Sequence, residues 1–238
     1  MVSTITLGDI VVQVTRKDIK NVHLSVYPPH GSVRIAAPRR MNLDTIRLFA
    51  IAKLAWIKKQ QRSLRAQNRE TPREFLERES HYVWGKRYLL KIVEESGSPC
   101  IKTKGKSLIL RIKPGSSESR RDSALSDWYR EQVREESALL LAKWEKRIGV
   151  KVKRVYVQHM KTKWGSCNRQ TGSIRLNTEL AKKPPECLEY ILVHELIHFL
   201  ERNHGERFVA LMNQHIPGWR VYRNRLNRLP LRHEQWSY

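Results

Sequence analysis

The stretch His194-Glu195-Leu196-Ile197-His198, followed after five residues by His204, decides how the rest of the chain is interpreted. An α-helix brings residues four apart onto one face, so His194 and His198 can bind one metal ion together. Glu195 lies one step further round the helix, where its carboxylate can reach a water molecule at the ion without being a ligand. The five residues before His204 let the helix end and the chain turn back. Three imidazoles and a water then make a tetrahedral site with one open position.

The H-E-x-x-H pattern is typical of zinc hydrolases. The helix that carries it is apolar on most sides, through Leu192, Val193, Leu196, Ile197, Phe199 and Leu200. Such a helix should be buried. Histidines and a glutamate on a buried helix need partners, because unpaired polar groups in an apolar interior are costly, and a metal ion supplies them. The alternative is an amphipathic helix whose polar residues face water.

The chain resembles a known family in two segments. Residues 194–208, with the pattern H-E-x-x-H-x5-H-G-E-R-F, resemble the YgjP-like branch of the SprT-like zincin metallopeptidases. The segment Met160-Lys161-Thr162-Lys163-Trp164-Gly165-Ser166-Cys167 resembles the same family upstream of the motif. The likeness is close over residues 150–228 and looser before them. The histidine spacing equals that of the metzincins, but Glu201 stands where those proteins have a helix-ending glycine.

The resemblance implies a zinc metallopeptidase, a hydrolase of peptide bonds. It implies one Zn²⁺ ion bound by His194, His198 and His204, with Glu195 as the general base. Each ligand histidine should also donate its second ring N–H to an acceptor. The sequence leaves open whether these acceptors are backbone carbonyls or the side chains of Glu189, Glu201 and Glu206. It also leaves open which group stabilises the oxyanion, for which the candidates are Tyr190, Tyr222 and His159.

The residues Trp164, Gly165 and Ser166 are the candidate wall of the substrate site. An edge strand beside the metal could pair with an extended peptide through main-chain hydrogen bonds. Gly165 would allow the two backbones to approach closely. The alternative is a bulge that packs Trp164 into the core.

The pattern of apolar residues predicts an α+β fold in two parts. Residues 1–115 should form an N-terminal antiparallel β-rich region with one basic helix, and residues 116–238 a zincin-like metallopeptidase domain. The boundary is placed at Pro114-Gly115-Ser116-Ser117, the clearest break in the chain. The expected elements are a small sheet within 4–37, a helix over 42–67, hairpins over 82–93 and 101–112, a helix over 118–148, a hairpin over 161–177, and helices over 186–202, 205–214 and 219–229.

The composition points to an anionic partner. The chain has 46 Lys and Arg against 23 Asp and Glu, a net charge of +23, so DNA or RNA could bind a basic surface. The alternative is a solvated basic surface. Two function hypotheses follow: a zinc peptidase, acting by analogy with related enzymes on DNA-associated proteins, and a nucleic-acid-binding module with a non-catalytic zinc site. A zinc hydrolase of non-peptide amides is a third.

Composition also bears on location. No apolar run approaches membrane-spanning length, so no membrane is expected as a partner. The start, Met1-Val2-Ser3-Thr4, lacks the features of a secretory signal. Cys100, Cys167 and Cys187 are too few and too scattered for a disulfide framework. We therefore expect a cytoplasmic protein.

Overall fold

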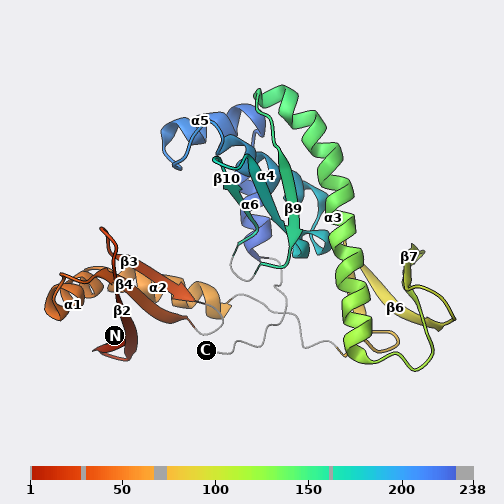
Figure 1. Ribbon diagram of the computed structural model, residues 1–238, viewed down its shortest axis with the longest axis horizontal. Coiled ribbons are helices and arrows are strands. Elements are labelled where there is room, and N and C mark those ends of the chain that lie inside the picture. Colours follow the sequence, from red (N-terminus) through yellow and green to blue (C-terminus); the bar gives the residue numbers. More distant parts are fainter. Residues whose placement is uncertain (1, 28–30, 67–73, 161–162, 229–238) are drawn as a thin grey trace. The chain divides into compact units, whose positions relative to one another are not determined.

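The computed structural model describes residues 2–27, 31–66, 74–160 and 163–228, and it has the expected α+β fold class (Figure 1). Contacts divide the chain between residues 68 and 69 into two compact units, which are described separately. The second unit contains both hairpins expected over 82–112. The division therefore does not coincide with the boundary expected between residues 115 and 116.

The first unit contains a four-stranded sheet with the order β1-β2-β4-β3. Its strands are β1 (Val2–Leu7), β2 (Ile10–Lys17), β3 (His23–Tyr27) and β4 (Ser32–Pro38). The two outer pairs are antiparallel, as expected, but β2 and β4 run parallel, so this sheet is mixed rather than purely antiparallel. The alternation of apolar residues marks both hairpins, but it does not say which strand of one hairpin lies beside the other.

The basic helix expected over residues 42–67 is two helices, α1 (Leu43–Ala52) and α2 (Leu54–Ala66), and Gln67 lies outside the described residues. The Asn42 side chain caps α1 by accepting a hydrogen bond from Thr45 N at 2.8 Å. The break falls at Lys53, whose N–H is shared between the carbonyls of Phe49 and Ala50. Such a shared bond is typical of a helix end. Residues from both helices are fully buried in the core of this unit.

The second unit begins with a sheet of the same topology. The strands β5 (Ser80–Val83), β6 (Lys86–Glu94), β7 (Cys100–Lys104) and β8 (Ser107–Ile112) have the order β5-β6-β8-β7, and β6 and β8 are parallel. Its apolar face is continuous with the core of the C-terminal elements, since Leu90, Leu108 and Leu110 belong to one buried cluster with Leu125 and Tyr129.

The long helix α3 (Glu118–Ile148) has the bounds that the sequence predicts. The Ser117 hydroxyl accepts a hydrogen bond from Arg120 N at its start, and Gly149 ends it with a left-handed φ of 75°. Both caps are strong local signals. Helix α3 packs against both α4 (Pro185–Ile197) and the short 3₁₀ helix η1 (Thr178–Lys182).

A small mixed sheet lies against α4. It has the order β10-β11-β9, formed by β9 (Arg154–Gln158), β10 (Gly165–Asn168) and β11 (Ser173–Asn177), and the 3₁₀ helix η1 (Thr178–Lys182) follows. The hairpin β10–β11 is the one expected over residues 161–177, of which residues 161 and 162 lie outside the described part of the chain. Strand β10 is an edge strand of this sheet, so one side of its backbone is unpaired within the described residues.

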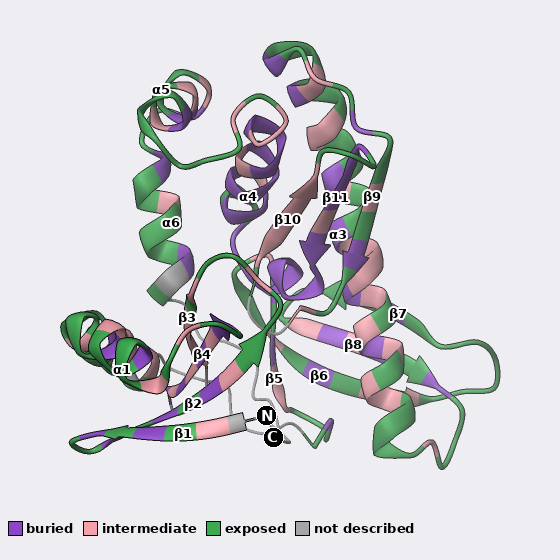
Figure 2. Cartoon of the chain, turned by 60° about the vertical axis from the view of Figure 1, so that its left-hand side comes forward, coloured by how far each residue is buried: buried purple, intermediate pink, exposed green. Residues whose placement is uncertain are grey.

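Helix α4 is the most deeply buried α-helix of this unit, as Figure 2 shows by its colour. It ends at Ile197 instead of the expected Arg202. Phe199 N and Leu200 N donate to carbonyls only three residues back, at 3.0 and 2.9 Å, so the helix tightens and stops. Helices α5 (Glu206–His215) and α6 (Trp219–Arg228) follow close to the expected bounds. No helix in the described ranges is both long enough and apolar enough to cross a membrane.

Candidate metal centre

Three histidines meet beside the end of α4. His194 lies in the last turn of α4, His198 caps its C-terminus, and His204 lies in the loop before α5. One ring nitrogen of each lies within 4.8 Å of the others, and His194 Nε2 and His204 Nε2 are 3.0 Å apart. The early end of α4 allows the chain to turn back, and this turn brings His204 to the other two.

The donor set fits a zinc ion. Zn–N bonds of about 2.0–2.1 Å in a tetrahedral site put two ligand nitrogens about 3.3 Å apart, close to the observed separation. The Nδ1 atom of His198 lies 3.0 Å from Glu201 O. Because a carbonyl only accepts, Nδ1 carries the proton and Nε2 is left unprotonated for the metal. Burial, with smaller effects of His198 and His204, lowers the pKa of His194 to about 3, so this ring is neutral as a ligand must be.

The acceptors for the second ring N–H groups are only partly those considered from the sequence. For His198 the acceptor is the backbone carbonyl of Glu201, whose side chain accepts from Asn203 N at 3.2 Å. His194 Nδ1 is buried and has no hydrogen-bond partner among the residues described. Glu189 instead joins α4 to α3, accepting from Lys143 Nζ at 2.7 Å and Trp144 Nε1 at 2.8 Å.

The ring of Phe208 forms a floor beneath the cluster. Its centroid lies 4.9 Å from the ring centroid of His194, 4.9 Å from that of His198 and 4.6 Å from that of His204. Phe208 is 1% exposed and lies in the first turn of α5. The sequence places Phe208 only in the core. Its position in the H-G-E-R-F segment, four residues after the last histidine, was the available signal for a role in holding the imidazoles.

Glu195 lies next to the histidines, on the side of α4 that faces β10. It is 6% exposed, and burial raises its pKa to about 7, against the opposing effect of Lys163. Gly165 of β10 packs directly on it, because a Cβ atom at this position would lie 2.8 Å from Glu195 Oε1 and 2.9 Å from Glu195 Cγ. The close backbone approach expected of Gly165 is therefore made to the glutamate.

An open cleft of about 850 Å³ runs along β10 to the histidines. It is lined by His194, Glu195, His198 and His204, by Gly165 and Ser166 of β10, and by polar and basic residues on either side. Trp164 is not among its lining residues. Its ring is half-buried against the core, and Lys183 Nζ lies 5.9 Å from the ring centroid. Of the three residues proposed as a substrate wall, Gly165 and Ser166 thus face the cleft. Lys161 and Thr162 lie outside the described residues.

The candidates for an oxyanion helper do not line this cleft. Tyr190 is buried, stacked on Trp219 with the ring planes 8° apart, and meets the edge of His194. Tyr222 packs against the core, and His159 borders a separate small cavity with Glu179. The described lining residues therefore include no tyrosine.

Asn177 holds the segment that leads into β10, a role not foreseen from the sequence. It is 4% exposed, and its Nδ2 donates to Met160 O at 2.7 Å and to Lys163 O at 2.8 Å. Its Oδ1 accepts from Glu179 N at 3.1 Å, and its backbone N–H donates to Trp164 O at 2.9 Å. Met160, Lys163 and Trp164 are more than ten residues away from Asn177 in the sequence, so no local pattern predicts these three contacts.

Comparison with known proteins identifies a family for this chain. The family described as YgjP-like, metallopeptidase domain, matches residues 20–229. Two crystal structures of metallopeptidase zymogens are similar. Pyrococcus abyssi abylysin is 23% identical, covering 37% of this chain and 88% of that one with a TM-score of 0.34. Methanocaldococcus jannaschii jannalysin is 26% identical, covering 40% and 86% with a TM-score of 0.31. No curated protein matches the sequence.

Proposed function

Because the chain belongs to the YgjP-like metallopeptidase family, we propose that it is a zinc peptidase with His194, His198 and His204 as ligands and Glu195 as general base. The observation that carries the proposal is the convergence of three ring nitrogens within 4.8 Å at the wall of an open cleft. No fourth His, Cys, Asp or Glu joins this group among the described residues, which leaves a position for water, as in catalytic zinc sites.

Each residue of the site has a separate role in the proposed hydrolysis. A zinc ion bound by the three imidazoles would lower the pKa of water and polarise the scissile carbonyl. The carboxylate of Glu195 takes the proton of the attacking water and passes it to the leaving amine nitrogen. Phe208 and the carbonyl of Glu201 hold the imidazole rings in place, so that little reorganisation is needed at the moment of reaction.

The substrate binds along β10. The unpaired backbone of this edge strand can add an extended peptide as a further strand, which places its carbonyl groups beside the histidines. Gly165 and Ser166 contact the peptide directly, and Trp164 supports them from the core side. A peptide is favoured over a non-peptide amide because the strand edge offers repeated main-chain partners.

The test combines zinc content with turnover. The full chain should bind one zinc ion and cleave casein or unstructured peptides, and a chelator should abolish cleavage. Glu195→Gln should keep the zinc and lose about 10²–10⁴-fold in kcat, the range for a general base. The matched control is Glu186→Gln, the same change at an exposed position in the first turn of α4, which should cleave normally. Normal cleavage by Glu195→Gln would remove that residue from the mechanism, and no cleavage by the zinc-loaded wild type would refute the peptidase.

A second candidate function, the binding of DNA or RNA, is favoured by one observation. Helix α2 exposes Lys58, Lys59, Arg62 and Arg65 on its surface, in a chain of net charge +23. A peptidase could use such a surface to reach DNA-associated proteins, or the chain could be a binding module with an idle zinc site. Duplex binding that weakens steeply with salt, persists in Glu195→Gln and occurs without any wild-type cleavage would favour the module.

We place the protein in the cytoplasm. The free thiols of Cys100, Cys167 and Cys187 support a reducing compartment. Fractionation of cells that express the tagged chain would test this location.

A further inference from the structure

We propose that the cleft selects acidic peptides, with Lys163 and Arg169 binding carboxylate side chains on the two sides of the scissile bond. This inference rests on the proposed peptidase function and names the substrate class of the same site. It assigns a binding role to two residues that have none in the catalytic chemistry.

The charges that line the cleft are strongly unequal. Among the described residues that border it, Glu195 is the one carboxylate, and it is buried beneath Gly165. Four cationic side chains border the same space: Lys163, Arg169, Arg175 and Arg202. A low-dielectric wall with charges of one sign raises the local concentration of ligands of the opposite sign.

The two cations at the ends of β10 are available to a ligand. Lys163 and Arg169 are exposed, and neither side chain has a hydrogen bond or ion pair within the described part of the chain. Both side chains border the cleft that contains the histidines. An acidic ligand would therefore meet unpaired partners there.

The placement of these cations fits an extended peptide. Lys163 comes two residues before Gly165, where β10 begins, and Arg169 directly follows Asn168, where β10 ends. The two residues are six positions apart in the chain, so they lie at most about 20 Å from each other. A peptide added at the edge of β10 thus has a cation near each end, and between them lies Gly165, which packs on Glu195. The backbone of Lys163 is fixed by its carbonyl bond to Asn177 Nδ2.

The same cations could in principle contact nucleic-acid phosphates, but the edge strand favours a peptide. Unpaired main-chain N–H and C=O groups alternate along β10, and an extended peptide matches this alternation whereas a duplex backbone does not.

The experiment uses the zinc-loaded full chain and fluorogenic peptides with one central sequence, flanked by glutamates, glutamines or lysines. The glutamate peptide should exceed the glutamine peptide in kcat/KM by about fivefold at low salt, as expected for two exposed ion pairs. The lysine peptide should be the poorest. The preference should shrink as salt screens the charges.

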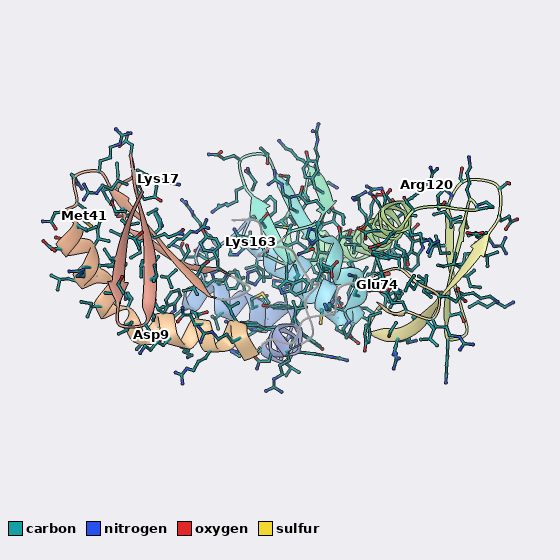
Figure 3. The ribbon with its side chains drawn as sticks, turned by 90° about the horizontal axis from the view of Figure 1, so that it is seen from below. Asp9, Lys17, Met41, Glu74, Arg120 and Lys163 are labelled. Atoms are coloured by element: carbon teal, nitrogen blue, oxygen red, sulfur yellow. The ribbon has the colours of Figure 1, made fainter. Side chains whose placement is uncertain are left out.

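Variants of the two cations test whether Lys163 and Arg169 cause the preference for acidic peptides. Lys163→Gln and Arg169→Gln should each lose part of it, and Arg169→Glu should shift it toward the lysine peptide, which a purely structural role would not do. Arg120→Gln is the matched control, since Arg120 is exposed at the start of α3 and away from the cleft lining, as its separation from Lys163 in Figure 3 shows. This variant should keep the full preference.

The outcomes separate the two proposals. Equal kcat/KM for the glutamate and lysine peptides would overturn the acidic preference and leave the peptidase standing. If no peptide is cleaved, the proposed peptidase function is refuted. The charge preference is then measured as the affinity of Glu195→Gln for the same peptides by fluorescence anisotropy, and equal affinities for the glutamate and lysine peptides overturn the proposed preference. Loss of duplex DNA binding in Lys163→Gln, without any effect of peptide charge, would assign the cations to nucleic acid instead.

Discussion

Gly165 and Glu195 are in contact across the cleft wall: a Cβ atom at residue 165 would lie 2.8 Å from Glu195 Oε1. Gly165→Ala must therefore push the carboxylate or the strand aside. We expect kcat to fall about 10- to 100-fold, because a displacement of about 1 Å at a reacting group can cost this much. Zinc content should stay unchanged, since no histidine is touched.

The control for this change is Gly205→Ala. Gly205 has a negative φ, and a Cβ atom there would meet nothing within 4 Å, so its kcat should stay near that of the wild type. Peptide hydrolysis and zinc content are measured for both variants. Wild-type kcat in Gly165→Ala would mean that the packing of Gly165 on Glu195 has no part in catalysis.

Features with local signals could be predicted from the sequence, and features set by distant contacts could not. Ser117 and Gly149 cap α3 within its own chain segment, so its bounds were predicted correctly. The parallel pairing of β2 with β4 depends on how two hairpins meet, which neither pattern contains. The motif brings His194, His198 and His204 together as expected.

The surroundings of the site were predicted less well than the motif. Phe208 could be assigned only to the core, because its contact with three imidazoles arises from the fold of the loop before α5. Helix α4 ends before the predicted Arg202, since a run of apolar residues does not reveal that Phe199 and Leu200 bond three residues back. Gly165 was expected beside the cleft, and the structure adds that it packs on Glu195.

Phe208→Leu should weaken zinc binding about tenfold. Leucine keeps the site apolar but removes the aromatic ring whose centroid lies 4.6–4.9 Å from the three imidazole centroids. Loss of a group that orients metal ligands typically costs about 10- to 100-fold in affinity. The free energy of unfolding of the apoprotein should fall by no more than about 1.5 kcal/mol. Competition with a coloured chelator gives the affinity, and thermal unfolding gives the stability.

Phe75→Leu is the matched change. Phe75 is 6% exposed in the same core cluster and does not line the metal cleft. It should lose comparable stability and keep the zinc affinity of the wild type. Equal loss of zinc in the two variants would show that the effect comes from general loosening and not from the floor beneath the histidines.

Asn177→Asp should destabilise the second unit and disturb the entry to β10. Aspartate places an acceptor where Nδ2 donates to the carbonyls of Met160 and Lys163, so two buried bonds become repulsive contacts. We expect the free energy of unfolding to fall by about 2–3 kcal/mol. Peptide KM should rise while zinc affinity holds, because Asn177 is not among the described residues that line the cleft with the three histidines. The matched control is Asn42→Asp. The side-chain oxygen that accepts from Thr45 N is retained in this variant, so the melting temperature should stay nearly unchanged.

The three thiols should react with iodoacetamide in the order Cys100, Cys167, Cys187. Cys100 is exposed, Cys167 is half-buried at the cleft, and Cys187 is fully buried. Burial raises the pKa of both Cys167 and Cys187 to about 11. A raised pKa favours the unreactive thiol, so at pH 8 only about one in a thousand of these groups is thiolate. Raising the pH should increase the rate at which Cys167 is alkylated, whereas Cys187 should react only after unfolding. Mass spectrometry of timed samples, with and without denaturant, gives the order. Rapid labelling of Cys187 in the folded protein would contradict the burial of this residue of α4 in the core.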